Sequence, residues 1–316
     1  MEAEAIKYID LQVNGYVGVD FNDPSVTIEQ IGEAAFAMQQ CGVTTALPTV
    51  ITASKEDMLA CISNLVNAIR NDVTVASVFS GIHIEGPFLS PLPGYIGAHP
   101  AEHAQAEDGD LLRELCDACD GLARIVTLAP EVDLTGGMTA YCASQGIRVA
   151  AGHTDAGLED LRRCIDAGLS LFTHLGNGCP RLMDRHDNII YRALQFRDRI
   201  SYSLIADGFH VPEILFRLLL DWIPHDRLIV VSDAISAAGL GPGTYRLAHR
   251  EVTIGPDKAA RDPSGEHFVG AACSMRDADE WLANQLGLSD DQRRNLLLIN
   301  AGNFLNCADA DTTPSQ

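Results

Sequence analysis

The chain has 316 residues, of which 47% are hydrophobic and 21% charged, and its formal net charge is −21. This composition is that of a globular protein, and a length above the usual domain size is still ordinary for one α/β barrel. The acidic balance and the lack of a Lys/Arg cluster in the sequence exclude a nucleic-acid-binding protein, which needs a cationic surface.

The sequence also argues against a membrane or secreted protein. No apolar run is long enough to cross a bilayer, and the start, MEAEAIKYIDLQ, lacks the basic and apolar regions of a signal peptide. Nine scattered cysteines, an odd number, suit a reducing compartment. The one C-x-x-C, Cys116 to Cys119, lies late in a helical pattern, so buried thiols are a simpler interpretation than a zinc or redox site. We expect a cytoplasmic protein that forms a single domain over residues 1–316.

Short apolar, β-branched runs alternate with amphipathic helical patterns along the chain. The helical patterns mostly begin near Ser, Thr, Asp or Pro and end near Gly or Pro, as capping and termination require. The predicted strands are residues 8–13, 43–50, 75–85, 124–130, 147–153, 169–175, 200–207 and 227–234. The predicted helices include residues 27–40, 54–70, 110–121, 158–167 and 212–223.

Eight strands that alternate with helices must pair in parallel, because each return crosses over a helix. Their continuous apolar character is typical of buried parallel strands. A closed (β/α)8 barrel of the TIM type fits the count best. An open doubly wound sheet is the alternative, but QVNGYVGVDF lacks the spacing of the glycine-rich phosphate loop that such a sheet normally carries after an early strand.

Five of the predicted strands end on groups that bind metals or transfer protons. The third ends on Glu85, the fifth on His153, the sixth on His174, the seventh on His210 and the eighth on Asp233. Each residue alone is a weak signal, because a single His is more often a packing residue and an Asp before a turn is commonly a cap. In a barrel, however, all five would meet at the C-terminal face, and burying them together is costly unless a cation compensates.

A divalent ion held by Glu85, His153 and His174 would keep one position for water, the usual arrangement of a catalytic metal site. Such an ion lowers the pKa of the water and can polarise a carbonyl group. Asp233, close to that water, could take its proton and pass it to a leaving amine. The combination predicts metal-dependent hydrolysis of an amide.

The same segments resemble the N-acetylglucosamine-6-phosphate deacetylases of the amidohydrolase superfamily. The matching segments run in the family's order from about residue 9 to 240: IDLQVNGYVGVDFN, GIHIEGPFLS with the later GAHP, TLAPE, AGHTDA, THLGNG, IADGFHV and VSDAISAAG. The resemblance implies an amidohydrolase barrel that hydrolyses the acetamide of N-acetylglucosamine 6-phosphate, giving glucosamine 6-phosphate and acetate. On it, Glu85, His153 and His174 fall on the family's metal ligands and Asp233 on its catalytic acid/base.

The resemblance also implies the contacts to substrate. His99 of GAHP and His210 of DGFH fall on substrate-contacting histidines, and Asn177 and Gly178 lie in the loop that meets the sugar phosphate. Arg185 falls where the family places a phosphate-binding arginine that reaches in from a neighbouring subunit. We therefore expect a homodimer, the common two-fold case, whose partner molecule is a phosphorylated amino sugar.

The first strand indicates how many metal ions to expect. It carries Gln12 and Asn14 where many amidohydrolases have a His-x-His pair that holds a second metal. Amide side chains are poor metal ligands, and even if they only cap the strand they supply no second site. The sequence thus predicts one divalent ion, for which Zn²⁺ is the first choice and Fe²⁺, Co²⁺ or Mn²⁺ are alternatives.

Three departures from the family pattern keep other readings open. The family's accessory β-sandwich has no counterpart in the sequence, and the loop after THL is the small, flexible Gly176-Asn177-Gly178-Cys179. The stretch Arg-Glu-Pro-Gly of the family is Arg185-His186-Asp187-Asn188 here, and Asp187 could weaken phosphate binding or orient Arg185. The alternatives are an amidohydrolase for another N-acyl sugar or amide, and a non-catalytic metal- or sugar-binding barrel.

Overall fold

The computed structural model describes residues 6–247, 250–255, 260–261 and 270–306. Its centre is a sheet of eight strands, in which every pair of neighbours runs parallel. The strands, in chain order and in order around the sheet, are β1 Tyr8–Val13, β4 Val43–Ile51, β5 Ile82–Glu85, β6 Ala123–Leu128, β7 Arg148–Ala151, β8 Leu169–Phe172, β9 Ser201–Ile205 and β10 Leu228–Val231.

The first and last strands meet and close the sheet into a barrel. Val13 forms a parallel bridge with Ala234, and the backbone N–H of Asp233 donates to the carbonyl of Gln12 at 3.0 Å. The predicted (β/α)8 barrel is therefore confirmed. Each strand is almost entirely buried, which explains why the sequence showed continuous apolar runs.

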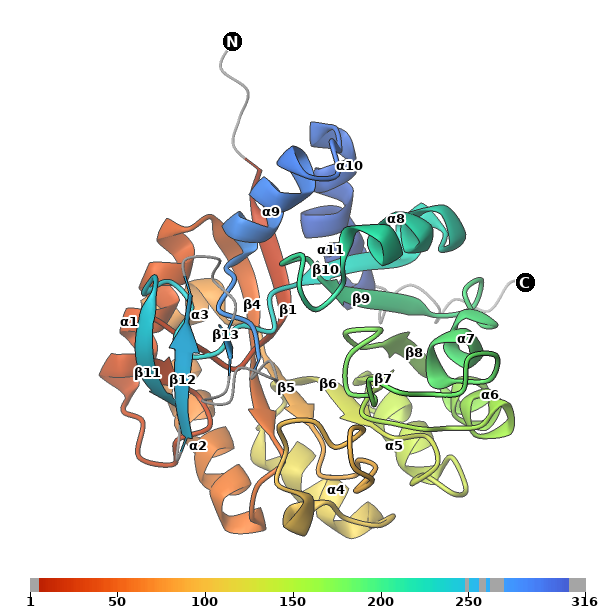
Figure 1. Ribbon diagram of the computed structural model, residues 1–316. Helices are drawn as coiled ribbons and strands as arrows, with labels where there is room; N and C mark the ends of the chain where they lie inside the picture. Colours follow the sequence, from red (N-terminus) through yellow and green to blue (C-terminus); the bar gives the residue numbers. More distant parts are fainter. Residues whose placement is uncertain (1–5, 248–249, 256–259, 262–269, 307–316) are drawn as a thin grey trace, which may run out of the picture.

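Helices surround the strands in Figure 1. Thr27 caps the first helix, α1, in a reciprocal capping box with Gln30, and Ser54 caps the second helix, α2, by accepting a hydrogen bond from the backbone N–H of Asp57. The helices are α1 Ile28–Gln40, α2 Lys55–Asn71, α3 Val73–Val78, α4 Gly109–Ala118, α5 Gly137–Ser144, α6 Leu158–Ala167, α7 Ile189–Leu194, α8 Glu213–Trp222, α9 Met275–Asn284, α10 Asp290–Arg294 and α11 Asn300–Asn306. Short helical segments that are not α-helical, labelled η1 to η3, lie at Ala101–His103, His225–Arg227 and Asn295–Ile299. The helices predicted from periodicity are confirmed within a few residues.

The third predicted strand, residues 75–85, is wrong in its first half. Residues Val73–Val78 form α3, and the strand β5 begins only at Ile82. The side chain of Asp72 accepts hydrogen bonds from the backbone N–H groups of Thr74 and Val75, at 2.7 and 3.0 Å, and so starts a short helix. This local cap outweighs the β-branched composition that favoured a strand.

Two small antiparallel elements flank the barrel, β2 Gly15–Tyr16 with β3 Val19–Asp20, and a sheet of β11 Gly243–Leu247, β12 Arg250–Ile254 and β13 Ala260–Arg261. The latter was not predicted; Figure 1 shows it at the left, with β11 and β12 near α1. Val252 and Ile254 of β12 bury a separate apolar cluster with Ile235 and Ala272. No accessory β-sandwich is present in the described ranges.

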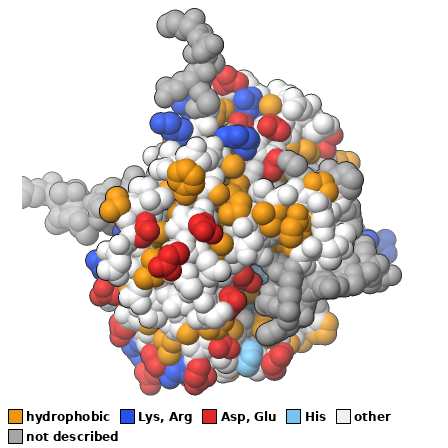
Figure 2. Space-filling view, turned by 90° about the vertical axis from the view of Figure 1, so that its left-hand side faces the viewer, with side chains coloured by type: hydrophobic (Ala, Val, Ile, Leu, Met, Phe, Trp, Pro, Cys, Tyr) orange, Lys and Arg blue, Asp and Glu red, His pale blue; other side chains and the backbone are white. Residues whose placement is uncertain are grey.

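The distribution of surface charge, the burial of two cysteines and the character of the helices agree with what the sequence predicts. Acidic side chains are scattered among apolar ones over the face seen in Figure 2, and no broad cluster of Lys and Arg covers its described part. Cys116 and Cys119 are both buried, as expected for packed thiols. None of the helices in the described part of the chain has the length and apolar character needed to cross a bilayer.

Candidate active site

The predicted site residues follow the ends of the barrel strands directly. Glu85 is the last residue of β5, and His153, His174 and Asp233 each lie two residues beyond β7, β8 and β10. The last three have positive φ angles, of 51°, 31° and 47°. In the described ranges two other non-glycine residues share this strained region. Strain of this kind persists where the surrounding structure enforces it, often at functional sites.

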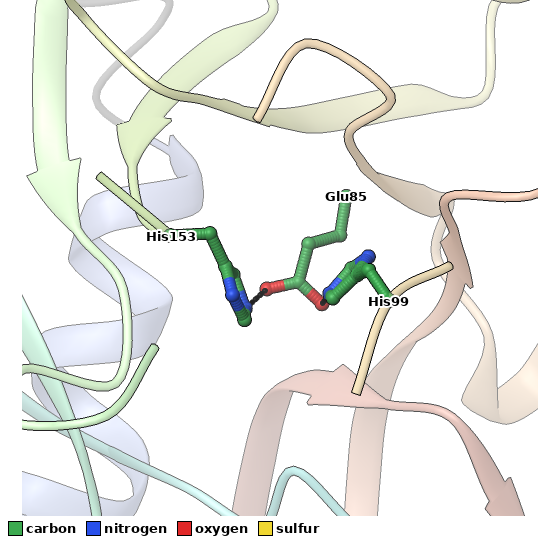
Figure 3. Close-up of side chains that lie close together, drawn as sticks. All are labelled: Glu85, His99 and His153. Atoms are coloured by element: carbon green, nitrogen blue, oxygen red, sulfur yellow. Dashed lines mark ion pairs between the residues drawn. The ribbon is translucent and has the colours of Figure 1, made fainter. Parts of the chain in front are cut away.

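Three imidazole rings converge on the buried carboxylate of Glu85. Nε2 of His174 lies 2.9 Å and Nε2 of His153 lies 3.5 Å from Oε1, and Nε2 of His99 lies 3.8 Å from Oε2. Figure 3 shows the carboxylate between the rings of His99 and His153. The potential ligand atoms of Glu85, His99 and His153 all lie within 4.8 Å of one another. The structure thus brings together the three predicted metal ligands and one predicted substrate contact.

The hydrogen-bond partner of Nδ1 distinguishes His153 from His99. In His153, Nδ1 lies 2.8 Å from the carbonyl oxygen of Tyr95, which can only accept, so the ring's proton is on Nδ1 and Nε2 offers a lone pair. In His99, Nδ1 accepts a hydrogen bond from the backbone N–H of Thr52 at 3.3 Å, and the hydroxyl oxygen of Thr52 lies 3.0 Å from the same Nδ1. The neutral ring of His99 therefore carries its proton on Nε2. Nε2 of His153 therefore has a free lone pair, which can bind a metal ion, whereas Nε2 of His99 is a hydrogen-bond donor.

Burial and neighbouring charged groups together set the charge state of this cluster. Burial lowers the pKa of His99 to about 3, so that ring is neutral at physiological pH. Burial alone would raise the pKa of Glu85, but the hydrogen bonds and charges of His153 and His174 outweigh it and hold the pKa well below its usual range. Glu85 is thus an anionic carboxylate that faces three imidazole rings.

A divalent cation fits this set of donors. The Nδ1 atom of His174 is buried and has no hydrogen-bond partner in the described part of the chain, which is costly for a polar atom. One carboxylate oxygen with imidazole nitrogens is the usual protein donor set of a mononuclear catalytic metal. A backbone carbonyl that orients His153 through Nδ1 is a typical outer partner of a metal-binding histidine.

Asp233, the predicted base, lies beside the cluster and is held by two amide side chains. Nδ2 of Asn14 and Nε2 of Gln12 donate to its Oδ1, at 2.8 and 3.2 Å. Burial raises the pKa of Asp233; the positive charge of His174 opposes this shift and the negative charge of Glu85 adds to it. A carboxyl group whose pKa is raised above its usual range is better suited to take up a proton near neutrality.

His210 follows β9 and is fixed by a residue that the sequence analysis did not assign to the site. Its Nδ1 lies 2.6 Å from Oδ2 of Asp207, whose other oxygen accepts from the backbone N–H groups of Phe209 and His210. Burial would raise the pKa of Asp207, but His210 outweighs it and lowers the pKa below its usual value. The Asp-x-x-His spacing after a strand was the signal that could have identified this pair.

The small loop after His174 is required by the packing of His153. Asn177 donates to the carbonyl of His174 from its backbone N–H and its side chain, at 2.9 and 3.2 Å. Gly178 has a φ of 60°, and a Cβ there would lie 2.9 Å from Nδ1 of His153. A Cβ at Gly97 would lie 3.0 Å from the same ring. The glycine at 178 therefore reflects close contact with a site histidine as well as backbone freedom.

Arg185, the predicted phosphate contact, forms no hydrogen bond or ion pair with this cluster. It is exposed and makes no hydrogen bond or ion pair with any described residue. Asp187, for which two effects on Arg185 were considered, instead pairs with Arg192 at 2.6 Å. Arg192 also binds Oδ1 of Asp155 at 2.9 Å, and so ties the loop after β8 to the loop after β7.

Comparisons with known proteins add independent evidence. No family model matches the chain. It is 30% identical over 296 residues to the N-acetylglucosamine-6-phosphate deacetylase of Bos taurus, covering 86% of this chain and 71% of the relative. It is 34% identical over 286 residues to the N-acetylgalactosamine-6-phosphate deacetylase of Shewanella sp. strain ANA-3, covering 89% and 68%. A solved N-acetyl-D-glucosamine-6-phosphate deacetylase from Mycobacterium smegmatis, in complex with N-acetyl-D-glucosamine-6-phosphate, superposes with a TM-score of 0.84 at 26% identity, covering 96% of this chain and 81% of that one.

Proposed function

Because the chain belongs to the N-acetylglucosamine-6-phosphate deacetylase family, we propose that it removes the acetyl group of N-acetylglucosamine 6-phosphate and releases glucosamine 6-phosphate and acetate. The observation that carries the proposal is the buried cluster of Glu85 and histidines at the barrel mouth, with the carboxylate of Asp233 beside it. A pure binding protein has no need of that base, which argues against a non-catalytic barrel.

We propose Glu85, His153 and His174 as the ligands of one divalent ion. One carboxylate oxygen and two imidazole nitrogens suit Zn²⁺ best, and Fe²⁺, Co²⁺ or Mn²⁺ are alternatives. When bound, the ion supplies Lewis acidity, which polarises the acetyl carbonyl and makes water a stronger acid. The proton on Nε2 excludes His99 from this ligand set in its neutral form.

Asp233 carries the proton in this proposal. Both of its hydrogen bonds, from Asn14 and Gln12, end on Oδ1, so Oδ2 is left to take the proton of the attacking water. Asp233 then gives that proton to the amine nitrogen as the C–N bond breaks. His99 donates through Nε2 to an oxygen of the substrate, and His210, held by Asp207, orients the sugar beside Asn177 and Gly178.

We further propose that the protein acts in the cytoplasm as a homodimer in which Arg185 binds the phosphate of a substrate in the neighbouring subunit. Its exposure and its lack of a partner in the described ranges support this proposal. The phosphate is dianionic or nearly so, and a protein with a net charge of −21 needs a local cation to hold it.

A second candidate substrate is N-acetylgalactosamine 6-phosphate, because the relative from Shewanella that carries this activity in its name is 34% identical. Acetate release from both phosphosugars and from their unphosphorylated forms tests the proposal. We expect the N-acetylglucosamine phosphate to give the highest kcat/KM. A higher value for the galactosamine phosphate would move the assignment to the second candidate, and no release from any of them would refute deacetylation.

A further inference from the structure

Gln12 lies between the two carboxylates of the proposed site. Its Nε2 donates to Oε1 of Glu85 at 3.0 Å and to Oδ1 of Asp233 at 3.2 Å, and the residue is 1% exposed. Carboxylates only accept, so each must take one of the two N–H bonds of the amide. The amide nitrogen therefore bridges a proposed metal ligand at the end of β5 and the proposed base after β10.

The oxygen of the same amide is held just as firmly. The hydroxyl of Thr173 donates to Oε1 of Gln12 at 2.6 Å. Thr173 directly precedes His174, and its Oγ1 lies 3.3 Å from Oγ of Ser203, which accepts from the backbone N–H of His174 at 2.8 Å. Rotating the amide by half a turn would aim its oxygen at two carboxylates and its nitrogen at a hydroxyl, so Thr173 and the carboxylates together select one orientation.

The bridging amide of Gln12 reduces the electrostatic repulsion between the two carboxylates. Glu85 ends β5 and Asp233 follows β10, and two carboxylates bonded to one buried amide nitrogen repel each other, at a cost in free energy. Two amide N–H dipoles between them offset part of that cost, and also set the distance between the groups. A buried amide with all its polar atoms bonded holds such a geometry better than a flexible contact would.

We propose that Gln12 is a positioning residue, which fixes the placement of Asp233 relative to Glu85, and that Thr173 locks its amide in the bridging orientation. This inference rests on the proposed function and assigns to Gln12 a role that is neither metal ligation nor capping of β1. In this proposal one side chain of β1 links the proposed metal ligand Glu85 to the proposed base Asp233.

The test compares Gln12→Met, Thr173→Val and the double variant with the wild-type protein. Both substitutions keep side-chain volume and remove the hydrogen bonds. We expect Gln12→Met to lower kcat on the order of 10- to 100-fold, to change KM by less than about threefold, and to weaken metal affinity in chelator competition by a similar factor. Thr173→Val should give a smaller loss of the same kind, and the double variant should be no worse than Gln12→Met.

Thr49→Val is the matched control, because Thr49 is also fully buried in the barrel, on β4, and its hydroxyl bonds only backbone groups of Val13 and Leu47. It should keep wild-type kcat and metal affinity.

Wild-type kcat and metal affinity in Gln12→Met, or additive losses in the double variant, would overturn the inference. If Gln12→Met does not fold by circular dichroism, an unchanged metal affinity and kcat in Thr173→Val would overturn it instead. If the wild type deacetylates none of the phosphosugars, the proposed function fails, while the metal affinities still decide the inference.

Discussion

The partner of Nδ1 separates the two buried histidines that flank Glu85. His153 gives its Nδ1 proton to the carbonyl of Tyr95, whereas His99 accepts at Nδ1 from the N–H of Thr52. Proximity alone would group both rings with Glu85 as metal ligands. On the basis of the tautomers we instead propose His153 as a metal ligand and His99 as a hydrogen-bond donor to substrate, the roles that the family resemblance implied.

This division predicts different outcomes for two alanine variants. His153→Ala removes a ligand, so the purified protein should bind metal at least about tenfold more weakly. His99→Ala should keep about one ion per chain and lose activity through substrate contacts, with kcat/KM lower by about 10- to 100-fold. Elemental analysis of both proteins, beside acetate release, checks this. Loss of metal from His99→Ala with full occupancy in His153→Ala would reverse the assignment.

Asp233→Asn tests the proton transfer. The asparagine keeps the size of the side chain and an oxygen to accept from Asn14, but its amide cannot take up a proton. Turnover should fall by about 10²- to 10⁴-fold, the usual contribution of a positioned acid–base group, while metal content stays unchanged. Activity within about threefold of wild type in the metal-loaded variant would exclude Asp233 as the base.

Much of the site could be read from single segments, because each key residue directly follows an apolar strand. Glu85, His153, His174 and Asp233 each carry this local signal. The hydrogen bonds of Gln12, Thr52 and Thr173 could not be predicted, since they join strands that are distant in sequence and depend on the register of the closed barrel. Asp207 could have been identified from the Asp-x-x-His spacing after β9, which the sequence analysis did not use.

At the scale of elements, the sequence predicted the eight barrel strands well because buried parallel strands are continuously apolar. It failed at α3, where one aspartate cap turns β-branched residues into a helix, and at β11 to β13, whose short strands carry weak alternation. Strand length was also overestimated at the C-terminal ends. Residues such as His153 and His174 lie beyond their strands, in turns with positive φ.

The loop that carries Gly178 makes a testable link between element and site. Gly178→Ala would place a Cβ 2.9 Å from the ring of His153 at a φ of 60°, so the ring or the loop must shift. We expect metal affinity and kcat to fall by about tenfold or more. Gly146→Ala is the control: its φ is 73°, but a Cβ there meets nothing within 4 Å. That variant should lose only about 1–2 kcal/mol of stability from backbone strain and keep its activity. Equal activity in both variants would show that the contact is not needed.

At the scale of the whole molecule, the exposure of Arg185 bears on whether one chain forms a complete substrate site. Arg185 is exposed and makes no hydrogen bond or ion pair with another described residue. The acidic protein surface does not replace it, because the field of the molecule repels a phosphosugar. The homodimer that we propose, in which a second copy completes the site, would account for both observations and make activity depend on assembly.

Mixing two impaired variants, assayed at a phosphosugar concentration well below KM, tests this arrangement. Arg185→Ala should raise KM for the phosphosugar by about tenfold or more and leave that for the unphosphorylated sugar unchanged, since a charge-assisted contact is lost. In a mixed dimer with Asp233→Asn, one of the two sites has both an intact base and an intact arginine from the neighbour. Refolding the two variants together should restore up to about half of the wild-type activity per mixed dimer. No recovery, or full activity in a monomer by analytical ultracentrifugation, would contradict an arginine supplied by the neighbour.

The central claim, metal-dependent amide hydrolysis at the Glu85 cluster, is tested most directly by acetate release from N-acetylglucosamine 6-phosphate before and after metal removal. Chelator-stripped protein should lose nearly all turnover, and titration with Zn²⁺ should restore it with an end point of about one ion per chain. Equal rates of acetate release from the stripped and the reconstituted protein would contradict the account.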